Sequence, residues 1–404
     1  MKKEPIAVGR PSLLRRTNAL TILKLLREAG SCSRADLVRA SGMSAPTVTN
    51  VVRDLVAANL IKPLGEGESS GGRPPDIIRF KAERGCILGV QIAAIAVSFL
   101  LTDLSGEEVD TVQVRLAGRK TSPEAICSLV GEQARLLLKK HKKARTQLLA
   151  LVVGVPAIAN VEEGIVLSIG TLDEWRSVPL RRLLNKRLDC LVIVENDTNL
   201  SALGERHRGA ARFEQTFILI DIGAIVSAGI VLEGKLHHGA HWSAGEIGYL
   251  RLPGVRRKPP SLHEFGELEA VIAGSGILQG WKEAIASAPS VRASQSRQMS
   301  ATGILDLAAA GDPVASKLIL GRAGIVVDVI VNLSLVLNPG LILLGGEVGC
   351  HPALLSLVKR ELEPCKFAIP RIASATLGEF AVLWGAIAVA LEAIPSLLLP
   401  MSMS

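Results

Sequence analysis

The stretch that most constrains this chain spans residues 33–75, where two short helical patterns meet at a tight turn. Ser33 precedes Asp36 by three residues, the spacing of a capping box, in which a hydroxyl and a carboxylate bind free backbone amides. Gly42 interrupts this first helix, and Ser44 is placed to cap a second one. The sequence therefore predicts a helix, a tight turn and a second helix.

The second of these helices has two distinct faces. Five apolar residues recur at helical spacing and form one face: Val48, Val51, Val52, Leu55 and Val56. Small polar and charged residues occupy the other side: Thr47, Asn50, Arg53 and Asp54, with Thr49 beside them. A short helix, a tight turn and a helix that starts with small polar residues are typical of a helix-turn-helix.

A two-stranded wing is expected after these helices. The chain becomes polar and glycine-rich after Ile61 and turns apolar again at residues 76–80. Between them, the tip at residues 71–75 reads Gly-Gly-Arg-Pro-Pro, so that Arg73 extends from a stiff loop. Three amphipathic helices of an unrelated helical domain would share part of this pattern. The basic wing in register favours DNA binding.

The predicted DNA contacts come from three segments. A first helix, expected at residues 13–29, leaves Arg16 on its outer side, available to phosphates. The second helix of the motif supplies the base contacts, and Arg73 enters a minor groove. The candidate DNA-binding residues are Arg16, Ser44, Thr47, Thr49, Asn50, Arg53 and Arg73.

Charge is distributed unevenly along the 404 residues. Residues 1–80 hold 13 Lys and Arg against 7 Asp and Glu, whereas the whole chain has a net charge of +8. The basic excess therefore lies on the predicted DNA reader, as electrostatic attraction to phosphates requires. The remainder is nearly neutral, which suits a soluble sensor or an enzyme.

Six scattered cysteines show no paired spacing for a zinc site or a redox dithiol. Reduced thiols in a cytoplasm are the simplest interpretation. The first residues lack the apolar core of a signal peptide. The apolar run at residues 86–101 is short for a membrane span and is interrupted by Gln91 and Ser98, so two buried strands are expected there.

After residue 80 the pattern changes from helical to strand-rich and then to mixed strand and helix. The buried strand at 191–199 delivers polar residues at its carboxyl end, where open α/β sheets bind ligands. Further strands, a segment of helices at 305–337 and a final helix near 383–394 follow. This order predicts a two-lobed α/β body that carries a helical head.

Four motifs of the body, in this order, resemble those of the ROK family, which joins sugar-responsive repressors and sugar kinases. They are ENDTN at 195–199, GEIGY at 245–249, GELE at 266–269 and LNPGLILLGG at 337–346. The Gly-Arg-Pro wing tip is similar to that of the repressor branch. The resemblance implies an α/β chain with an N-terminal winged helix-turn-helix and a two-lobed, actin-like ATPase (ribonuclease H-like) body. It also implies a homo-oligomer.

The resemblance suggests domain boundaries as well. We expect the DNA-binding domain at residues 1–80 and a sensor and oligomerisation body at 81–404. Within the body, one lobe comprises residues 81–200 and the C-terminal helix, and the other comprises residues 201–385.

Both phosphate loops of the family's kinases are altered. Where kinases carry a DIGGTK-like loop, residues 91–96 read Gln-Ile-Ala-Ala-Ile-Ala, without the acid and the glycines that approach phosphate. The second loop, GTGIGAG-like in kinases, keeps only its outer glycines, Gly223 and Gly229. The pair Gly345-Gly346 survives, but such a pair often only makes a tight turn. We therefore expect no ATP cofactor and no catalytic residue.

The family's zinc site is also altered. Its ligands are the His of GEIGH and three Cys, and here Tyr249 stands at the His position. The Cys positions hold Pro260, Leu262 and Glu267, and His263 nearby is a lone histidine. No metal site is expected.

The sugar pocket is better preserved. The resemblance places Asn196, Asp197, Glu246, Tyr249 and Glu269 on ligand-contacting positions, with Tyr249 replacing a His. Carboxylates and an amide can bind vicinal hydroxyls at fixed angles. Asp197 would be the general base of a kinase, but here it is expected only to bind. The alternative is structural, because Asn and Asp after a strand also cap helices.

These observations predict a cytoplasmic transcriptional repressor of carbohydrate uptake or catabolism genes, with a kinase-like body that senses a sugar or sugar derivative without phosphorylating it. Its expected partners are a double-stranded DNA operator, a sugar-like effector and further copies of the chain in a homodimer or homotetramer, with no membrane. Two alternatives stay open: a sugar kinase with a DNA-binding head, and a DNA-binding oligomer that has lost its ligand.

Overall fold

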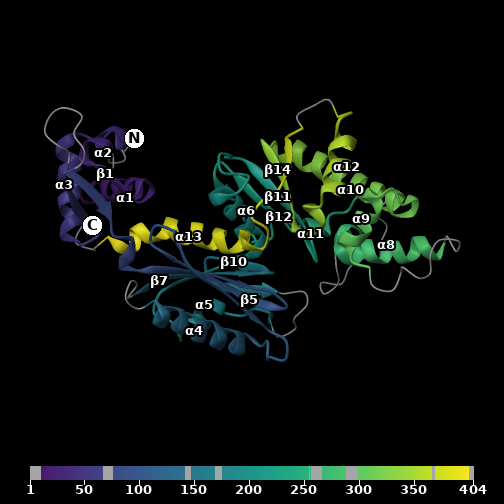
Figure 1. Ribbon diagram of the computed structural model, residues 1–404, viewed down its shortest axis with the longest axis horizontal. Coiled ribbons are helices and arrows are strands. Elements are labelled where there is room, and N and C mark those ends of the chain that lie inside the picture. Colours follow the sequence, from purple (N-terminus) through teal and green to yellow (C-terminus); the bar gives the residue numbers. More distant parts are fainter. Residues whose placement is uncertain are drawn as a thin grey trace, which may run out of the picture.

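The computed structural model describes residues 11–66, 76–141, 147–168, 175–253, 255, 266–287, 299–365 and 369–399. A small head and two larger lobes follow one another in Figure 1, and one long helix, α13, reaches from between the lobes to the head. The predicted α/β class with a helical head is confirmed.

The head contains three helices and a small antiparallel sheet with strand order β1-β3-β2. Its elements are α1 (Pro11–Ala29), β1 (Ser31–Ser33), α2 (Arg34–Ser41), α3 (Ala45–Ala57), β2 (Ile61–Glu66) and β3 (Asp76–Phe80). The predicted wing is the β2–β3 pair. Strand β1 was not predicted, because three residues are too few to show an alternating pattern.

Most of the predicted apolar face of α3 is buried, which the packing of α3 against α1 and α2 explains. Val48 and Val52 are fully buried and Val51 is nearly so. Val56 corrects the prediction, since it is 38% exposed. Its neighbour Leu55 is fully buried, so Val56 lies at the solvent edge of the apolar face.

The first lobe is a five-stranded sheet with order β10-β7-β4-β5-β6. Its strands are β4 (Cys86–Ile92), β5 (Ala96–Asp103), β6 (Glu108–Arg115), β7 (Leu148–Val155) and β10 (Leu191–Asn196). The helices are α4 (Pro123–Lys140), α5 (Leu180–Asn185) and α6 (Asp197–Arg208), and β8 (Ile158–Asn160) pairs with β9 (Ile165–Ser168). The apolar run at 86–101 thus forms two paired strands, β4 and β5, as predicted.

The second lobe is built on a sheet with order β13-β12-β11-β14-β15. Its strands are β11 (Phe217–Ile222), β12 (Val226–Leu232), β13 (Lys235–Leu236), β14 (Leu341–Gly345) and β15 (Arg371–Ser374). Its helices are α7 (Glu269–Ile272), α8 (Gly274–Ala286), α9 (Ala301–Ala309), α10 (Pro313–Leu337), α11 (Gly346–Gly349) and α12 (Pro352–Leu362). Short 3₁₀ turns occur at Ala82–Arg84, Ile247–Tyr249 and Gly378–Phe380.

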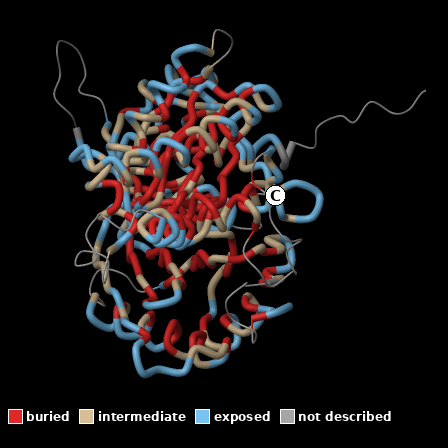
Figure 2. Tube along the Cα trace, turned by 90° about the vertical axis from the view of Figure 1, so that its right-hand side faces the viewer, coloured by how far each residue is buried: buried red, intermediate tan, exposed pale blue. Residues whose placement is uncertain are grey.

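Helix α13 (Ala381–Leu398) belongs to the first lobe although it ends the described chain. It packs on α6 and on strands β4 and β7, and its far end contacts α1 of the head. One apolar cluster therefore continues from head residues such as Leu26 through Ile394 and Ile387 of α13 to Val152 of the sheet. Figure 2 shows the buried residues, in red, concentrated inside the body.

Helices α6 and α13 cross at two glycines. A Cβ on Gly204 would lie 2.1 Å from the carbonyl oxygen of Ala381, and one on Gly385 would lie 1.8 Å from that of Leu200. Only glycine lets the two backbones approach this closely. The crossing fixes α13 against the helix that begins at Asp197.

Two helices of the described chain, α10 and α13, are long and apolar enough to cross a membrane, judged by length and composition alone. In α13 most of the apolar stretch is buried against the sheet and α6, as in the core helix of a soluble protein. Helix α10 packs against α8, α9 and α12 of the second lobe.

Candidate functional site

The helix caps of the head are those that the sequence predicts. The backbone N–H of Asp36 donates to the Ser33 hydroxyl at 3.2 Å, and the N–H of Ser33 donates to the Asp36 carboxylate at 2.8 Å. The Ser33 hydroxyl also donates to the Asp36 carboxylate at 2.7 Å, and the two bonds that the carboxylate accepts from Ser33 hold the pKa of Asp36 below its ordinary value. Gly42 takes the left-handed conformation, with φ 68°, and Ser44 caps α3. Together they fix the angle between α2 and α3.

The outer face of α3 presents polar side chains to solvent. Ser44, Thr49 and Asn50 are exposed, and Thr47 is half-buried with its hydroxyl 2.8 Å from that of Ser44. The Arg53 side chain is 73% exposed and lies 3.5 Å from the carboxylate of Asp54. This face is free to enter a groove, and the DNA contacts of these residues stay predictions.

The two other predicted DNA-binding residues differ in position. Arg16 is half-buried, and its Nη2 donates to the backbone carbonyl of Ser396 in α13 at 3.1 Å. The structure thus gives Arg16 a contact that joins the head to the body, which sequence reasoning did not foresee. Arg73 lies outside the described residues, as does the wing tip.

The candidate ligand cleft lies between the lobes, with a volume of about 490 Å³. Asp197, the first residue of α6, lines it and accepts a hydrogen bond from the N–H of Thr198 at 2.8 Å. Burial, followed by the nearby Asp221 and Glu246, raises the pKa of Asp197 to about 7. Burial also raises the pKa of Asp221, at the end of β11, to about 6. Two half-buried carboxyls with raised pKa values therefore face one cleft.

Asn196 has a structural task that the sequence left open. Its side-chain oxygen accepts from the N–H of Asn199 at 3.0 Å and so caps α6. Its Nδ2 donates to the carbonyl of Ala157 at 3.1 Å. The amide is thus already bonded within the protein, and ligand contact by Asn196 stays a prediction.

Glu246, Tyr249 and Glu269 come together on the second lobe. The Glu269 carboxylate accepts from the N–H of Val226 at 2.9 Å, which ties it to the altered second phosphate loop. Burial and Glu269 raise the pKa of Glu246, and burial, Glu246 and Glu269 raise that of Tyr249. Tyr249 is 49% exposed, at the rim of this group. Glu246 also raises the pKa of Asp197, but of the five predicted ligand residues only Asp197 lines the cleft itself.

Sequence reasoning missed a second pair beside this cluster. Glu195 is buried, and its Oε2 lies 2.7 Å from Nε2 of His238, whose pKa this contact raises. The other oxygen of Glu195 accepts from Nδ2 of Asn199 at 3.0 Å. A further bond, 2.6 Å between the hydroxyls of Thr198 and Ser227, joins the two lobes. In the sequence, an acid that follows an apolar strand and directly precedes the Asn-Asp pair is the signal that could have indicated Glu195.

The altered phosphate loops have clear positions in the structure. Gln91 and Ile225 both line the cleft, so an amide and an apolar side chain stand where kinase loops place an acid and a glycine. Gly346 has φ 75°, and a Cβ there would lie 2.4 Å from the carbonyl of Ile222. Close packing therefore accounts for this glycine without a phosphate, as the sequence suggested. Among the cleft-lining residues that the structure describes, none is positively charged.

Of the residues at the family's zinc positions, only Tyr249 and Glu267 belong to the described chain. Glu267 lies 3.6 Å from the guanidinium of Arg251, as in a surface ion pair. Pro260, Leu262 and His263 lie outside the described residues.

Comparisons with known proteins support the same division into a DNA-binding head and a kinase-like body. The profile of the ROK family matches residues 87–393, and a winged helix-turn-helix DNA-binding profile matches residues 15–62. The chain is 28% identical to a xylose repressor of Caldicellulosiruptor bescii, over 60% of this chain and 60% of that protein. It is also 28% identical to a glucokinase of Halalkalibacterium halodurans, over 72% of this chain and 90% of that one.

A solved structure has a similar fold. It is that of a ROK family transcriptional regulator described as a homologue of the Escherichia coli Mlc protein, with a TM-score of 0.79 and 22% identity. The match covers 95% of this chain and 98% of that one, head included. A family profile that spans most of the body, together with the winged head, settles the classification: the chain belongs to the ROK family.

Proposed function

We propose that this chain is a DNA-binding transcriptional repressor of carbohydrate uptake or catabolism genes, whose kinase-like body binds a sugar or sugar derivative and does not phosphorylate it. A cytoplasmic location and a homodimer or homotetramer belong to the same proposal. Both a named repressor and a named kinase are similar to the chain, so the choice rests on its own residues.

The observation that carries the proposal is the path from the ligand cleft to the head. Asp197 begins α6, α6 crosses α13 at Gly204 and Gly385, and α13 ends against α1. Arg16 and Arg27 of α1 both donate to backbone carbonyls of α13. A ligand that moves α6 would thereby move the head.

The test measures operator release. The operator is first selected from a random DNA library, and its binding is then followed by fluorescence anisotropy against a panel of pentoses, hexoses and amino sugars. We expect one sugar class to weaken operator binding. Asp197→Asn and Glu246→Gln should abolish that response with little change in operator affinity, and Asp189→Asn, an exposed site, serves as the matched control. If no sugar in the panel weakens operator binding, the result would favour a DNA-binding oligomer that has lost its ligand.

The kinase alternative has one observation in its favour, the half-buried Asp197, whose pKa is raised, at the position of a kinase's general base. Phosphoryl transfer also needs the γ-phosphate held by backbone N–H groups and a metal. Ile225 fills part of the cleft, and the described lining offers acids without a cation. We expect no ATP-dependent phosphorylation of any common sugar above background in a coupled assay. Sugar phosphate that forms with the wild type and not with Asp197→Asn would overturn the repressor proposal.

A further inference from the structure

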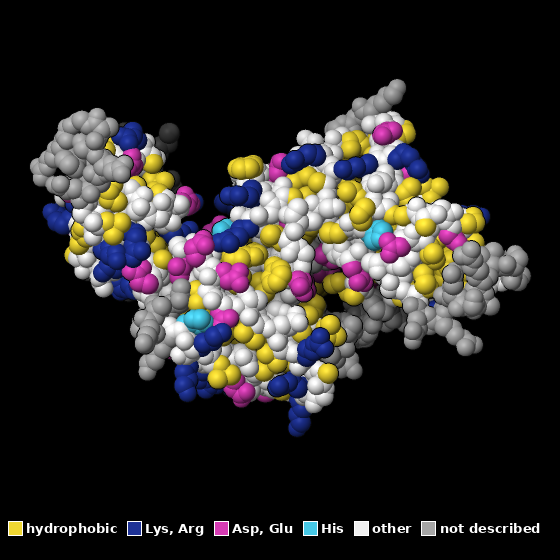
Figure 3. All heavy atoms as spheres, viewed as in Figure 1, with side chains coloured by type: hydrophobic (Ala, Val, Ile, Leu, Met, Phe, Trp, Pro, Cys, Tyr) yellow, Lys and Arg dark blue, Asp and Glu magenta, His cyan; other side chains and the backbone are white. Residues whose placement is uncertain are grey.

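A second cavity, of about 1000 Å³, lies between the head and the body, away from the ligand cleft. Its walls come from the end of α1, the turn between β5 and β6, the end of α6 and the middle turns of α13. In Figure 3, Lys and Arg side chains, a histidine and several Asp and Glu side chains lie together on the edge of the body that faces the head. No residue of this cavity takes part in the sugar site described above.

The cavity carries an excess of positive charge. Five cationic side chains line it: Lys24, Arg27, Arg206, Arg208 and Arg212. Three carboxylates line it as well: Glu28, Glu107 and Glu392. Of the five cations, only Arg208 forms a salt bridge with a described residue, at 3.5 Å to Glu107. The cations therefore outnumber the acids, and most of them have no carboxylate at contact distance.

Several of these groups are held in place by the protein. Arg27 donates to the backbone carbonyl of Leu391 in α13. Arg208 donates to the carbonyl of Gly106 at 2.8 Å, and its guanidinium stacks 3.8 Å above the Trp384 ring. Arg206 donates to the carbonyl of Gly234. Guanidinium groups fixed in this way are ready to bind an anion with little loss of conformational freedom.

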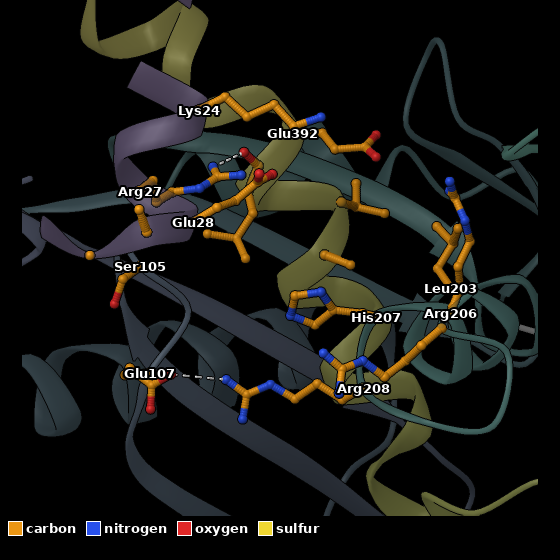
Figure 4. Close-up of a pocket in the computed structure, with 16 residues that line it drawn as sticks. Lys24, Arg27, Glu28, Ser105, Glu107, Leu203, Arg206, His207, Arg208 and Glu392 are labelled. Carbon is orange, nitrogen blue, oxygen red and sulfur yellow. Dashed lines mark hydrogen bonds and ion pairs between the residues drawn. The ribbon is translucent and has the colours of Figure 1, made fainter. Parts of the chain in front are cut away.

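His207 lies at the centre of the cavity wall, between Arg27 and Arg208 (Figure 4). Its Nε2 is buried and has no hydrogen-bond partner among the described residues. Burial, with Arg208, Arg27 and Arg212, lowers the pKa of His207 to about 4, so the imidazole is neutral in the empty cavity. In folded proteins such a buried polar atom is usually paired with an ordered water or a bound group.

We propose that this cavity binds a small phosphate-bearing metabolite, held between the head and the body. Phosphate suits the site because several guanidinium groups can bind its oxygens in pairs, and because its negative charge balances the excess of cations. Since Arg27 belongs to the head and Arg206 and Arg208 to the body, the ligand fixes the head relative to the body and changes operator affinity.

The test uses isothermal titration calorimetry of the full chain at fixed ionic strength. The probes are inorganic phosphate and glucose 6-phosphate, with chloride and glucose as controls. We expect saturable binding of a phosphate probe, at least tenfold weaker in the double variant Arg206→Gln/Arg212→Gln. Arg115→Gln, at the far end of β6 from Glu107, removes the same kind of charge and should leave affinity unchanged.

A variant that is expected to strengthen phosphate binding tests whether a loss of binding in the double variant comes only from misfolding. Glu107→Gln removes a carboxylate from the wall and should tighten phosphate binding several-fold. Asp189→Asn, at an exposed position of the body, should leave phosphate binding unchanged. The titration contains no sugar apart from the glucose control, so phosphate binding can succeed or fail independently of the proposed sugar response. Absence of saturable binding, or equal weakening by Arg115→Gln, would each overturn the proposal.

Discussion

Asn50 sits on the exposed side of α3, opposite the fully buried Val48 and Val52, and its amide can donate to and accept from a base edge. We expect Asn50→Ala to change base preference at one operator position by about 1–3 kcal/mol. The measurement is selection from a random DNA library followed by binding to the selected sites. Asn18→Ala, the same change in α1, is the control. An unchanged preferred sequence would show that another part of the head reads the bases.

Asp197 makes the stability of the protein depend on pH. Its pKa is raised from 3.8 to about 7 in the folded chain, so between these values the folded state holds a proton that the unfolded state has lost. The free energy of unfolding should therefore fall as pH rises from about 4 to 7. Asp197→Asn should remove most of this fall and raise stability at pH 7.5 by about 1–3 kcal/mol. Urea denaturation of both proteins across this range measures the effect.

The exposed Asp189→Asn provides the comparison for that experiment. It should leave the slope of stability against pH as in the wild type. A slope that is the same in wild type and Asp197→Asn would mean that the Asp197 carboxyl is ionised in the folded protein. The neighbouring Asp221, whose pKa is also raised, would then carry the shared proton.

Residues with local partners were the most predictable. The bonds of Ser33 and Asp36 span three residues, so the sequence spacing alone indicates them. Arg16 was assigned only to phosphates, yet it bonds Ser396, 380 positions along the chain. For Asn196 the sequence allowed both a cap and a ligand contact, and only the structure reveals the cap. Contacts between distant segments depend on packing that no local pattern contains.

At the scale of helices, the crossing of α6 and α13 is the element on which the proposed coupling depends. Gly385→Ala would place a methyl group 1.8 Å from the carbonyl of Leu200, so the helices must separate. We expect a loss of about 1–3 kcal/mol in the free energy of unfolding. We also expect operator binding to become insensitive to the sugar. Thermal unfolding and anisotropy measure the two effects.

Helix α10 offers a matched glycine. A Cβ on Gly324 meets nothing within 4 Å, so Gly324→Ala should stabilise the chain by roughly 0.5–1 kcal/mol through helix propensity. It should also leave the sugar response intact. If the two alanine variants behaved alike, close approach at the crossing would not be what links the cleft to the head.

Elements were predicted better than their edges and crossings. The apolar run at 86–101 contained enough pattern to predict β4 and β5, and the valine spacing predicted α3. The short β1 carries too few residues to be recognised, and Val56 follows the helical period although it lies at the solvent edge of the apolar face. The close contact of Gly204 and Gly385 joins segments far apart in sequence, which periodicity cannot reveal.

On the scale of the whole molecule, the arrangement favours a two-state regulator. The head shares one apolar cluster with α13 and the first sheet, so it is packed on the body instead of tethered by a linker. The cleft opens between lobes that the Thr198–Ser227 bond also joins. A ligand that changes the angle between the lobes therefore acts on the contacts that hold the head.

Linkage makes this coupling measurable from both ends. If the sugar found in the panel weakens operator binding by some factor, saturating operator must weaken sugar binding by the same factor. We expect a factor of about 5–150, the usual range for coupling of 1–3 kcal/mol. Calorimetry of the sugar, with and without saturating operator, gives one factor, and anisotropy gives the other. A DNA duplex of equal length without the operator should change sugar affinity little. A single thermodynamic cycle allows only one coupling free energy, so factors that differ beyond error would mean that one titration had not reached equilibrium. A factor of 1 in both titrations would show that the sugar and the operator are not coupled, which contradicts the prediction.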